Sequence, residues 1–538
     1  TEVPGAANIS NAGSINAQGD GLNGGEIYLI APDVENSGVI TAPNGEILLA
    51  AGASVELLNS LDPNLRVNIT APAGDVTNVG QLVAESGSLG LFGTMVNNTG
   101  VVSADSAVME GGKIVFKSSQ RTNAGGTISA TGNGGGTIEI LSDMQDGIVD
   151  VTGTVDASAP QNGDGGFIDT SAAHVHIDDG AQISASAANG ASGEWLIDPL
   201  NVTIGISPSD VGGTFVGGIW TPTAPGSFIT SGTIETALNG GTGVTISTVN
   251  AAFTTDAGNI NVDTSINKTA GAATTLTLLA ENDIIFAANS AISSGGALPQ
   301  ALDVVLRADL DGDGVGTVNF LGTGSAFDLA TGRVDLYYNP TSYAAPTNYA
   351  TWMGVTPNTA WMLVNDVGLE NGGVTGLQAM NINKAGNYAL GKNIDATVTA
   401  TWNGGLGFTS VGTTNIANSF TGNFDGMGHS IDGLFINRPN TNYQGLFGYT
   451  NGATISNTVL TNTNVAGRTN VGGLAAYARA SNIMSSSVAG SMSGDLNVGG
   501  LVGISAAGTT IDTSSSSGTV SGNDLVGGLL GNNSASNV

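Results

Sequence analysis

Apolar and polar residues alternate in short stretches through the first third of the chain, and one phrase of this alternation returns about every 25 residues. The phrase is Asn-x-Gly-x-Val/Ile-x-Ala, as in Asn36-Ser-Gly-Val-Ile-Thr-Ala42. In several copies a Gly and a second short apolar stretch follow, such as Gly112-Lys-Ile-Val-Phe. The copies begin at Asn11, Asn36, Asn78, Asn98, Asn123 and, more loosely, Val151. A strand-like pattern with a fixed period predicts the stacked coils of a β-solenoid.

The same phrase predicts where its residues lie in each coil. Val, Ile, Leu and Ala are expected to point inward, and Thr, Ser and Asn outward. Gly and Asn are expected at corners, where the backbone often needs a positive φ. Like residues of successive coils then stack, so Asn36, Asn78, Asn98 and Asn123 are predicted to form an Asn ladder. Residues 59–68 are expected to leave the coil as a loop.

Changes in this pattern divide the chain into four segments. Residues 1–195 carry the regular coils, and residues 196–340 continue as a less regular β-helix in which 234–247 again read as short strands. Residues 341–440, which contain Pro and Trp residues, are expected to form an excursion and then return to coils. Residues 441–538 carry a tighter Gly-Leu repeat, whose glycines Gly445, Gly473, Gly500 and Gly528 are 28, 27 and 28 residues apart. Such even spacing predicts one coil per repeat.

Composition supports an all-β protein and excludes some partners. Only 10% of the 538 residues are charged, 83 are Gly and none is Cys. Asn, Thr and Ser supply the polarity, and these residues are poor in helix interiors. The net charge of −31 argues against nucleic-acid binding, which needs clustered Lys and Arg. No apolar run reaches the roughly 18 residues of a membrane helix, so no membrane insertion is expected. The absence of an initiator Met suggests a segment of a longer protein.

Several phrases resemble those of a known family. The Asn-x-Gly-x-Ile-x-Ala coils, Glu194-Trp-Leu-Ile-Asp-Pro-Leu-Asn-Val-Thr-Ile204 and Asn282-Asp-Ile-Ile resemble filamentous-haemagglutinin-type exoproteins, the secreted partners of bacterial two-partner secretion. Phe424-Asp-Gly-Met-Gly-His-Ser-Ile and the Gly-Leu phrases resemble the GLUG repeats found in many such adhesins. Together these phrases cover nearly the whole chain.

The resemblance implies a right-handed parallel β-helix, export through an outer-membrane β-barrel partner, and a place outside the cell or on its surface. It implies a role in adhesion or biofilm cohesion, with a host-cell or matrix glycan or protein as the bound partner. The family's N-terminal secretion domain is not evident here, so the chain is expected to be a rigid, non-catalytic stalk. Two alternatives remain open: a fibre subunit that self-associates through strand edges, and a polysaccharide-active β-helix enzyme.

The sharpest local motif is Asp309-Leu-Asp-Gly-Asp-Gly314. Carboxylates at alternate positions with a following Gly allow a tight loop to fold oxygen atoms around a Ca²⁺ ion. An EF-hand would place Glu at the twelfth position, where this chain has Phe320. Asp309, Asp311 and Asp313 are therefore predicted as calcium ligands outside an EF-hand, with an ordinary acidic turn as the alternative.

Aromatic residues around the Pro-containing stretch 337–361 are the predicted binding surface. Aromatic rings on a polar β surface bind sugars through their apolar faces. The alternative is that they cover irregular coils. The residues of this excursion are Trp352, Trp361, Tyr337, Tyr338 and Tyr343. Further candidates for the same role are Trp195, Trp220 and Trp402.

No catalytic residue is predicted. A lyase usually needs a basic residue near a cation-held carboxylate, and Arg307 and Arg333 are the basic residues nearest the Asp motif in sequence. A hydrolase needs two convergent carboxylates, but Asp and Glu keep no consistent coil position. His174 and His176 point to one face of a strand, so a zinc pair with Asp178 or Asp169 is conceivable, although spacing fixes no third ligand.

Overall fold

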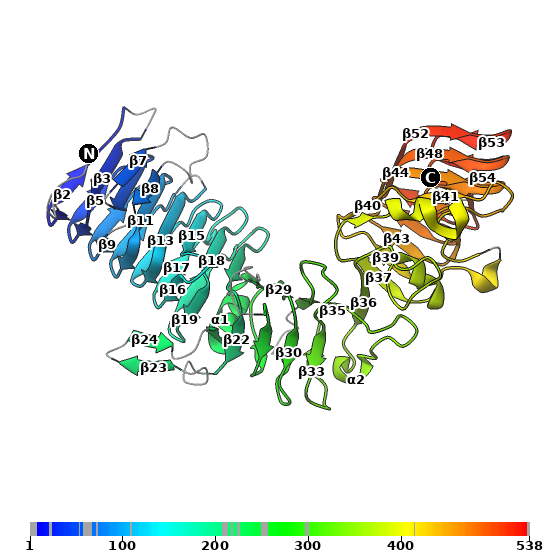
Figure 1. The fold of residues 1–538 in the computed structure, drawn as a ribbon. Helices are drawn as coiled ribbons and strands as arrows, with labels where there is room; N and C mark the ends of the chain where they lie inside the picture. Colours follow the sequence, from blue (N-terminus) through cyan, green and yellow to red (C-terminus); the bar gives the residue numbers. More distant parts are fainter. Residues whose placement is uncertain are drawn as a thin grey trace. The chain divides into compact units, whose positions relative to one another are not determined.

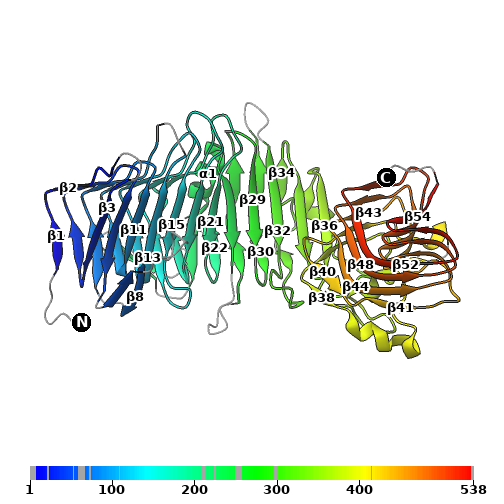
Figure 2. The same cartoon turned by 90° about the horizontal axis from the view of Figure 1, so that it is seen from above.

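The chain forms a β-solenoid. The computed structural model describes residues 8–20, 24–52, 54–57, 67–71, 74–107, 110–206, 213–216, 219–222, 226–248, 257–295, 301–413 and 415–534. It is all-β, with 49% strand and 7% helix, and forms a parallel β-solenoid of about 17 turns (Figures 1 and 2). The prediction of an all-β parallel β-helix is confirmed. Its right-handed winding and the four-segment division remain predictions.

The chain is organised into two compact units. Unit 1 comprises Thr1–Arg307, Val318–Val334 and Ala350–Asn358, and unit 2 comprises Ala308–Thr317, Asp335–Tyr349 and Thr359–Val538.

Each coil of unit 1 contributes strands to three faces. The first face stacks, in parallel and in register, β3 (Glu26–Ala31), β6 (Glu46–Ala51), β11 (Ser88–Asn98), β13 (Lys113–Ala124), β15 (Thr137–Leu141), β18 (Phe167–Ser171), β21 (Glu194–Asp198), β26 (Gly243–Ser247), β29 (Thr274–Leu279) and β32 (Leu302–Arg307). The second face stacks β1 (Ile9–Asn11), β4 (Val34–Asn36), β9 (Asp75–Asn78), the second halves of β11 and β13, β16 (Ile148–Val151), β19 (His174–Ile177), β25 (Ser227–Thr230), β22 (Val202–Gly205), β27 (Ile260–Val262), β30 (Ile284–Phe286) and β33 (Val318–Phe320).

The third face of unit 1 is interrupted by a helix. Its first sheet is β2 (Ser14–Asn16), β5 (Val39–Thr41), β10 (Gln81–Val83), β12 (Val101–Ser103), β14 (Thr127–Ser129), β17 (Thr154–Asp156) and β20 (Gln182–Ser184). Its second sheet is β28 (Ile266–Lys268), β31 (Ile292–Ser294) and β34 (Phe327–Leu329). Helix α1 (Ser231–Gly240) contacts both β20 and β28, so it occupies the position of a strand between the two sheets.

Two antiparallel hairpins also belong to unit 1. They are β7 (Ser54–Leu57) with β8 (Val67–Ala71), and β23 (Gly213–Val216) with β24 (Ile219–Pro222). Of the predicted loop at 59–68, Val67 and Asn68 belong to β8, and the rest lies outside the described residues. A short helix, α2 (Ala350–Met353), contacts β34.

The inward residues of unit 1 form continuous apolar rows. On the first face, Ile47, Leu89, Ile114 and Ile138 are register partners and at most 1% exposed. The alanine that ends the repeat phrase is fully buried in successive coils, as at Ala42, Ala84, Ala104, Ala130 and Ala157. Because each of these side chains packs on its equivalent in the next coil, one residue type recurs at each inward position.

The glycine of the repeat phrase is required by close stacking. A Cβ on Gly38 would lie 2.0 Å from the Gly13 carbonyl oxygen, and one on Gly80 would lie 2.1 Å from that of Gly38. Gly100 repeats this relationship with Gly80, at 2.2 Å. None of these three glycines has a positive φ. The expectation of left-handed corners was therefore wrong here, and contact between backbones of adjacent coils excludes any side chain.

The Asn ladder is present, but Asn123 is not one of its members. The Nδ2 of Asn36 donates to Oδ1 of Asn78, and Nδ2 of Asn78 donates to Oδ1 of Asn98, both over 2.8 Å. The register partner of Asn98 is Ala124, and its Nδ2 donates to the Gly125 carbonyl. Asn123 points outward instead. Its phrase, Asn123-Ala-Gly-Gly-Thr-Ile-Ser-Ala130, has one extra residue, and a one-residue shift reverses the side of a strand residue.

Of the stretch 234–247 that was predicted as strands, the first part is helical, because α1 covers residues 231–240, while Gly243–Ser247 forms β26 as predicted. Thr230 caps it, because its side chain accepts a hydrogen bond from Thr233 N, and Gly241 ends it with φ 89°. Thr233, Ile234, Ala237 and Leu238 form its buried face. A Thr cap, apolar residues at helical spacing and a terminal Gly were the signals for this helix, although the segment is short and rich in strand-forming residues.

The coils of unit 2 also stack their strands into several faces. One face stacks β36 (Asn358–Val364), β37 (Asn387–Leu390), β39 (Asn423–Asp425), β43 (Thr454–Ser456), β47 (Asn482–Met484) and β51 (Thr510–Asp512). A second has β38 (Ile394–Asp395), β40 (Ser430–Asp432), β44 (Val459–Ala466), β48 (Ser487–Ser493) and β52 (Ser515–Ser521), with β41 (Phe435–Asn437) beside β44. The others are β45 (Thr469–Gly472), β49 (Leu496–Gly499) and β53 (Asp524–Gly527), and β42 (Phe447–Asn451), β46 (Ala475–Arg479), β50 (Val502–Ala506) and β54 (Leu530–Ser534).

Strand β35 (Val334–Tyr338) begins with the last residue of one unit 1 segment, Val334, and continues in unit 2 from Asp335. Three 3₁₀ helices belong to unit 2: η3 (Leu377–Ile382), η4 (Thr397–Gly405) and η5 (Ile416–Asn418).

Each Gly-Leu repeat forms one coil of unit 2. Ile455, Ile483 and Ile511 are register partners on β43, β47 and β51, and all three are buried. The leucines of the phrase, Leu446, Leu474 and Leu501, are fully buried. The prediction of one coil per repeat is confirmed for these strands.

Candidate functional site

Unit 1 contains an aromatic pocket near its third face. Its walls come from residues 286–291, from residues between Phe320 and Ala326, and from Trp352, and they enclose about 220 Å³. Phe286 and Phe320 are register partners on β30 and β33, and their rings stack at 4.7 Å between centroids. Trp352, on α2, stacks on Phe320 at 5.2 Å, and its Nε1 donates to the Gly322 carbonyl over 2.7 Å. The pocket therefore has a preorganised aromatic wall.

The structure separates the five aromatic residues that the sequence nominated. Trp352 lines the pocket of unit 1. Trp361 lies in unit 2, where it stacks on Tyr337 at 6.0 Å with the rings 8° from parallel. Both tryptophans are partly exposed.

The three nominated tyrosines are core residues. Tyr338 and Tyr343 are 1% and 0% exposed, and Tyr337 is also buried. The Tyr343 hydroxyl donates to the Leu363 carbonyl over 2.8 Å, and burial raises the pKa of this phenol. Their nomination as ligand contacts is corrected, because a buried ring has no face to offer a ligand.

Phe286 and Phe320 were not nominated from the sequence. Each ends a short apolar strand phrase, Ile284-Ile-Phe286 and Val318-Asn-Phe320. Matching strand ends was the available signal, since register partners stack on one another in a solenoid.

The Asp309 loop brings together the three carboxylates predicted for calcium. Ligand oxygens of Asp309, Asp311 and Asp313 all lie within 4.8 Å of one another, and among the described residues they form the one such group of acidic, His or Cys side chains. Asp309 is fully buried with φ 56°, while Asp311 and Asp313 are exposed. Oxygen ligands on a tight loop suit Ca²⁺.

Hydrogen bonds also order this loop. Oδ1 of Asp309 accepts from Gly314 N over 3.1 Å, and Oδ2 accepts from Nδ2 of Asn365 over 2.5 Å. Burial raises the pKa of Asp309 to about 6, while these hydrogen bonds act in the opposite direction. Asp311 and Asp313 accept backbone N–H bonds from Asp313 and Val315.

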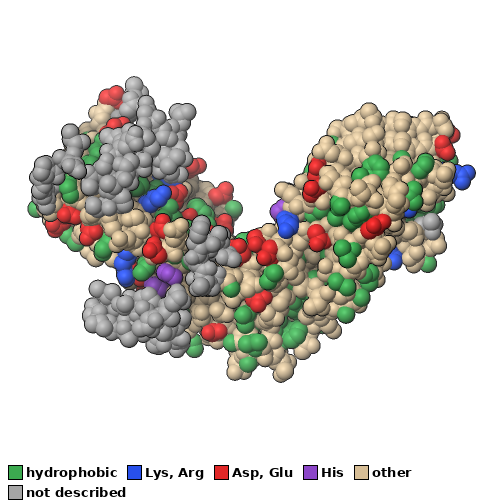
Figure 3. Space-filling view, in the orientation of Figure 1, with side chains coloured by type: hydrophobic (Ala, Val, Ile, Leu, Met, Phe, Trp, Pro, Cys, Tyr) green, Lys and Arg blue, Asp and Glu red, His purple; other side chains and the backbone are tan. Residues whose placement is uncertain are grey.

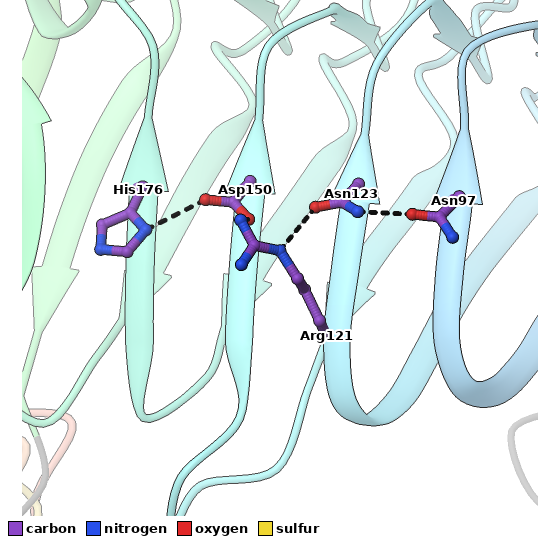
Figure 4. Close-up of polar contacts among 5 residues, drawn as sticks. All are labelled: Asn97, Arg121, Asn123, Asp150 and His176. Atoms are coloured by element: carbon purple, nitrogen blue, oxygen red, sulfur yellow. Dashed lines mark hydrogen bonds and ion pairs between the residues drawn. The ribbon is translucent and has the colours of Figure 1, made fainter. Parts of the chain in front are cut away.

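A row of polar residues crosses the second face of unit 1 (Figure 4). Asn97, Asn123, Asp150 and His176 are successive register partners on β11, β13, β16 and β19. Asp150 lies between Arg121 and His176: its Oδ2 is 2.5 Å from Nη2 of Arg121, and its Oδ1 is 3.0 Å from Nδ1 of His176. Arg121 Nε also donates to Oδ1 of Asn123, and Nδ2 of Asn123 donates to Asn97.

This row replaces the conceivable zinc pair. The carboxylate beside His176 is Asp150 from the preceding coil, where Asp178 or Asp169 had been considered. Neither His174 nor His176 belongs to a three-residue metal group among the described residues. The row joins adjacent coils through charge-assisted hydrogen bonds.

Acidic side chains are scattered over the face seen in Figure 3, and basic ones are few. One carboxylate on the first face of unit 1, that of Asp198, has an unusual pKa. Burial is the main cause that raises this pKa to about 7, and repulsion from Asp169 and Glu281 adds to it. Its Oδ1 is buried and has no hydrogen-bond partner.

Comparisons with known proteins give one partial likeness to report. No family model matches the chain. A stretch of 137 residues is 39% identical to Halomucin from Haloquadratum walsbyi; it is 24% of this chain and 2% of Halomucin. No helix among the described residues is long and apolar enough to cross a membrane.

Proposed function

We propose that this chain is a stalk segment of a secreted bacterial surface adhesin of the filamentous-haemagglutinin type. The observation that carries the proposal is the stacking of like side chains from coil to coil within each unit. Buried Asn36, Asn78 and Asn98 are joined by hydrogen bonds from coil to coil, and Ile455, Ile483 and Ile511 stack in the same way in unit 2. Since each coil is stabilised by its neighbours, a solenoid resists local unfolding under load.

The partial likeness to Halomucin supports a surface role. Halomucin's name marks it as mucin-like, and the matched stretch is 39% identical. Because the match spans only 2% of Halomucin, it carries over nothing about what the whole of Halomucin does. Export through an outer-membrane β-barrel partner and binding of a host or matrix glycan or protein are proposed from the resemblance of the repeat phrases.

The proposed role is non-catalytic. None of the residues lining the aromatic pocket is titratable, so this pocket supplies no general acid or base of its own. The carboxylates of the Asp309 loop are held by hydrogen bonds within that loop and from Asn365. We assign this loop a stiffening role, with Ca²⁺ as its ligand.

Three experiments on the native protein test the proposal. Antibodies raised against this chain should label intact cells, and beads coated with the chain should adhere to surfaces carrying the partner cells or matrix. Labelling only after the cells are permeabilised would overturn the surface role. Turnover of an acidic polysaccharide by the purified chain would overturn the non-catalytic role and favour the enzyme alternative.

A further inference from the structure

The aromatic pocket of unit 1 has a size and lining suited to a small ligand. Its volume of about 220 Å³ is below the roughly 300–1,000 Å³ of pockets for drug-sized molecules, so it has room for one ring. Residues 286–291 form one wall, in a turn closed by Ser290 N and Oγ, which both donate to the Ala287 carbonyl. The wall is therefore fixed without a ligand.

The aromatic part of the pocket is also held in place. Phe286 is buried, while Phe320 and Trp352 are partly exposed. Phe320 lies between the other two rings, with centroids 4.7 Å from Phe286 and 5.2 Å from Trp352. The bond from Trp352 Nε1 to the Gly322 carbonyl fixes the orientation of the indole. Because these rings are already ordered, the binding of a ligand that stacks on them costs little conformational entropy.

The polar part of the pocket carries no charge. Asn289 is exposed and offers an amide, and Ser325 contributes a hydroxyl that donates to the Phe327 carbonyl. None of the lining residues is Asp, Glu, Lys, Arg or His. An uncharged lining with aromatic and amide groups matches a ligand that has both an apolar face and neutral hydroxyls. An ionic ligand would lose water without gaining an opposite charge.

We propose that this pocket binds one neutral pyranose ring of a glycan, with the C–H face of the sugar against the Trp352 indole and its hydroxyls toward Asn289. The inference deepens the proposed function and rests on it, because it names the ligand class and position of one binding site on the stalk. A single ring in a small pocket binds weakly, with a dissociation constant on the order of 1 mM. High apparent affinity would then come from several copies on one surface.

Saturation-transfer NMR with the whole chain tests the proposal. The probes are the methyl glycosides of glucose, galactose and mannose at about 10 mM, ten times the expected dissociation constant. The wild type should give a signal with one of them. Methyl glucuronide, which has a similar ring with a carboxylate, should give a weaker signal.

Two variants and two matched controls locate the site. Trp352→Ala removes the aromatic wall, and Trp361→Ala removes a similarly stacked, partly exposed tryptophan outside the pocket. Gly324→Leu adds a bulky side chain to the pocket lining, where a Cβ meets nothing within 4 Å and the backbone φ is ordinary. Gly240→Leu, at the end of α1, adds the same side chain at another open position. We expect at least a tenfold loss of binding in Trp352→Ala and Gly324→Leu, and no loss in the controls.

Two outcomes would overturn the proposal: no signal with any methyl glycoside, even where phenol binds, or full binding by both Trp352→Ala and Gly324→Leu. The test is separable from that of the proposed function. Surface labelling does not depend on Trp352, so failure of the sugar test leaves the stalk role standing. Failure of surface labelling would remove the stalk role, whether or not the pocket binds a sugar in solution.

Discussion

The ammonium of Lys268 donates to the carbonyl oxygen of Leu238 over 2.8 Å, at the C-terminal end of α1. Lys268 is fully buried on β28, and the same ammonium donates to the Ala270 carbonyl over 2.6 Å. A cation at this position complements the negative end of the helix. The bond therefore fastens the helix to the strand that follows it in the third face.

Side chains of the helix also accept hydrogen bonds from backbone N–H groups of β28 and of the residues that follow it. Glu235 accepts from Asn267 N over 2.7 Å, and Asn239 accepts from Thr269 N and Ala270 N. Glu235 and Asn239 are four residues apart, so they lie on one face of α1. Side chains of the helix thus replace the backbone partners that a neighbouring strand would have supplied.

Lys268→Met should destabilise unit 1. Methionine keeps the length of the side chain but leaves buried carbonyls without the ammonium, at a cost of about 1–3 kcal/mol. Urea unfolding followed by circular dichroism measures the loss. Lys117→Met, at an exposed position of β13, is the matched control and should change stability little. Equal effects of the two substitutions would show that Lys268 does not hold the helix.

Asn78→Ala should cost much more stability than Asn123→Ala. Asn78 is fully buried and joins Asn36 to Asn98, so its loss leaves an amide donor and an acceptor unpaired, at about 2–4 kcal/mol. Asn123 is partly exposed on the outer row, and its replacement should cost about 1 kcal/mol or less. Similar midpoints of urea unfolding for the two variants would contradict the register described for these coils.

Asp198 should make unit 1 less stable as the pH rises from about 4 to 7. Its folded pKa is raised to about 7, so between these values the folded protein holds a proton that the unfolded chain has released. The contribution is present below the unfolded pKa and is lost as the pH passes the folded pKa.

Asp198→Asn tests this, because the amide has the same shape and no charge. We expect it to flatten the pH dependence and to stabilise the protein at pH 8 by on the order of 2–4 kcal/mol. Thermal unfolding at a series of pH values from 4 to 8 provides the measurement. Asp328→Asn, on the exposed side of β34, is the control. An unchanged pH slope in Asp198→Asn would remove this carboxyl as the cause.

Calcium should bind the Asp309 loop and raise the thermal stability of unit 2. Calorimetric titration with CaCl₂ at pH 7.5 should give heat in the wild type and at least tenfold weaker binding in Asp311→Asn. Since the folded pKa of Asp309 is raised to about 6, binding should weaken as the pH falls through 6 and a proton competes with the ion. Asp328→Asn is the control and should bind calcium as the wild type does. If Asp311→Asn also gives the heat of the wild type, the loop is an ordinary acidic turn that does not bind calcium.

Much of the fold follows from short-range sequence signals. The repeat phrase predicted stacked parallel coils because inward residues must match those of the next coil, and the Gly-Leu phrase predicted one coil per repeat for the same reason. The proximity of Asp309, Asp311 and Asp313 also follows from local spacing, since alternate residues of one tight loop must lie close together.

The remaining features depend on contacts between residues that are distant in sequence. One extra residue after Asn123 turned it from the buried ladder to the outer row, and the registration of neighbouring strands decides which side it takes. Asp150 could be matched with His176 and Arg121 only when three coils were stacked, and Phe286, Phe320 and Trp352 formed a pocket in the same way. The repeat by itself determined the solenoid, because stacking like on like is a local rule. The pocket, the buried tyrosines and the helix in place of a strand were decided by tertiary structure, because burial and hydrogen-bond partners there are supplied by other coils.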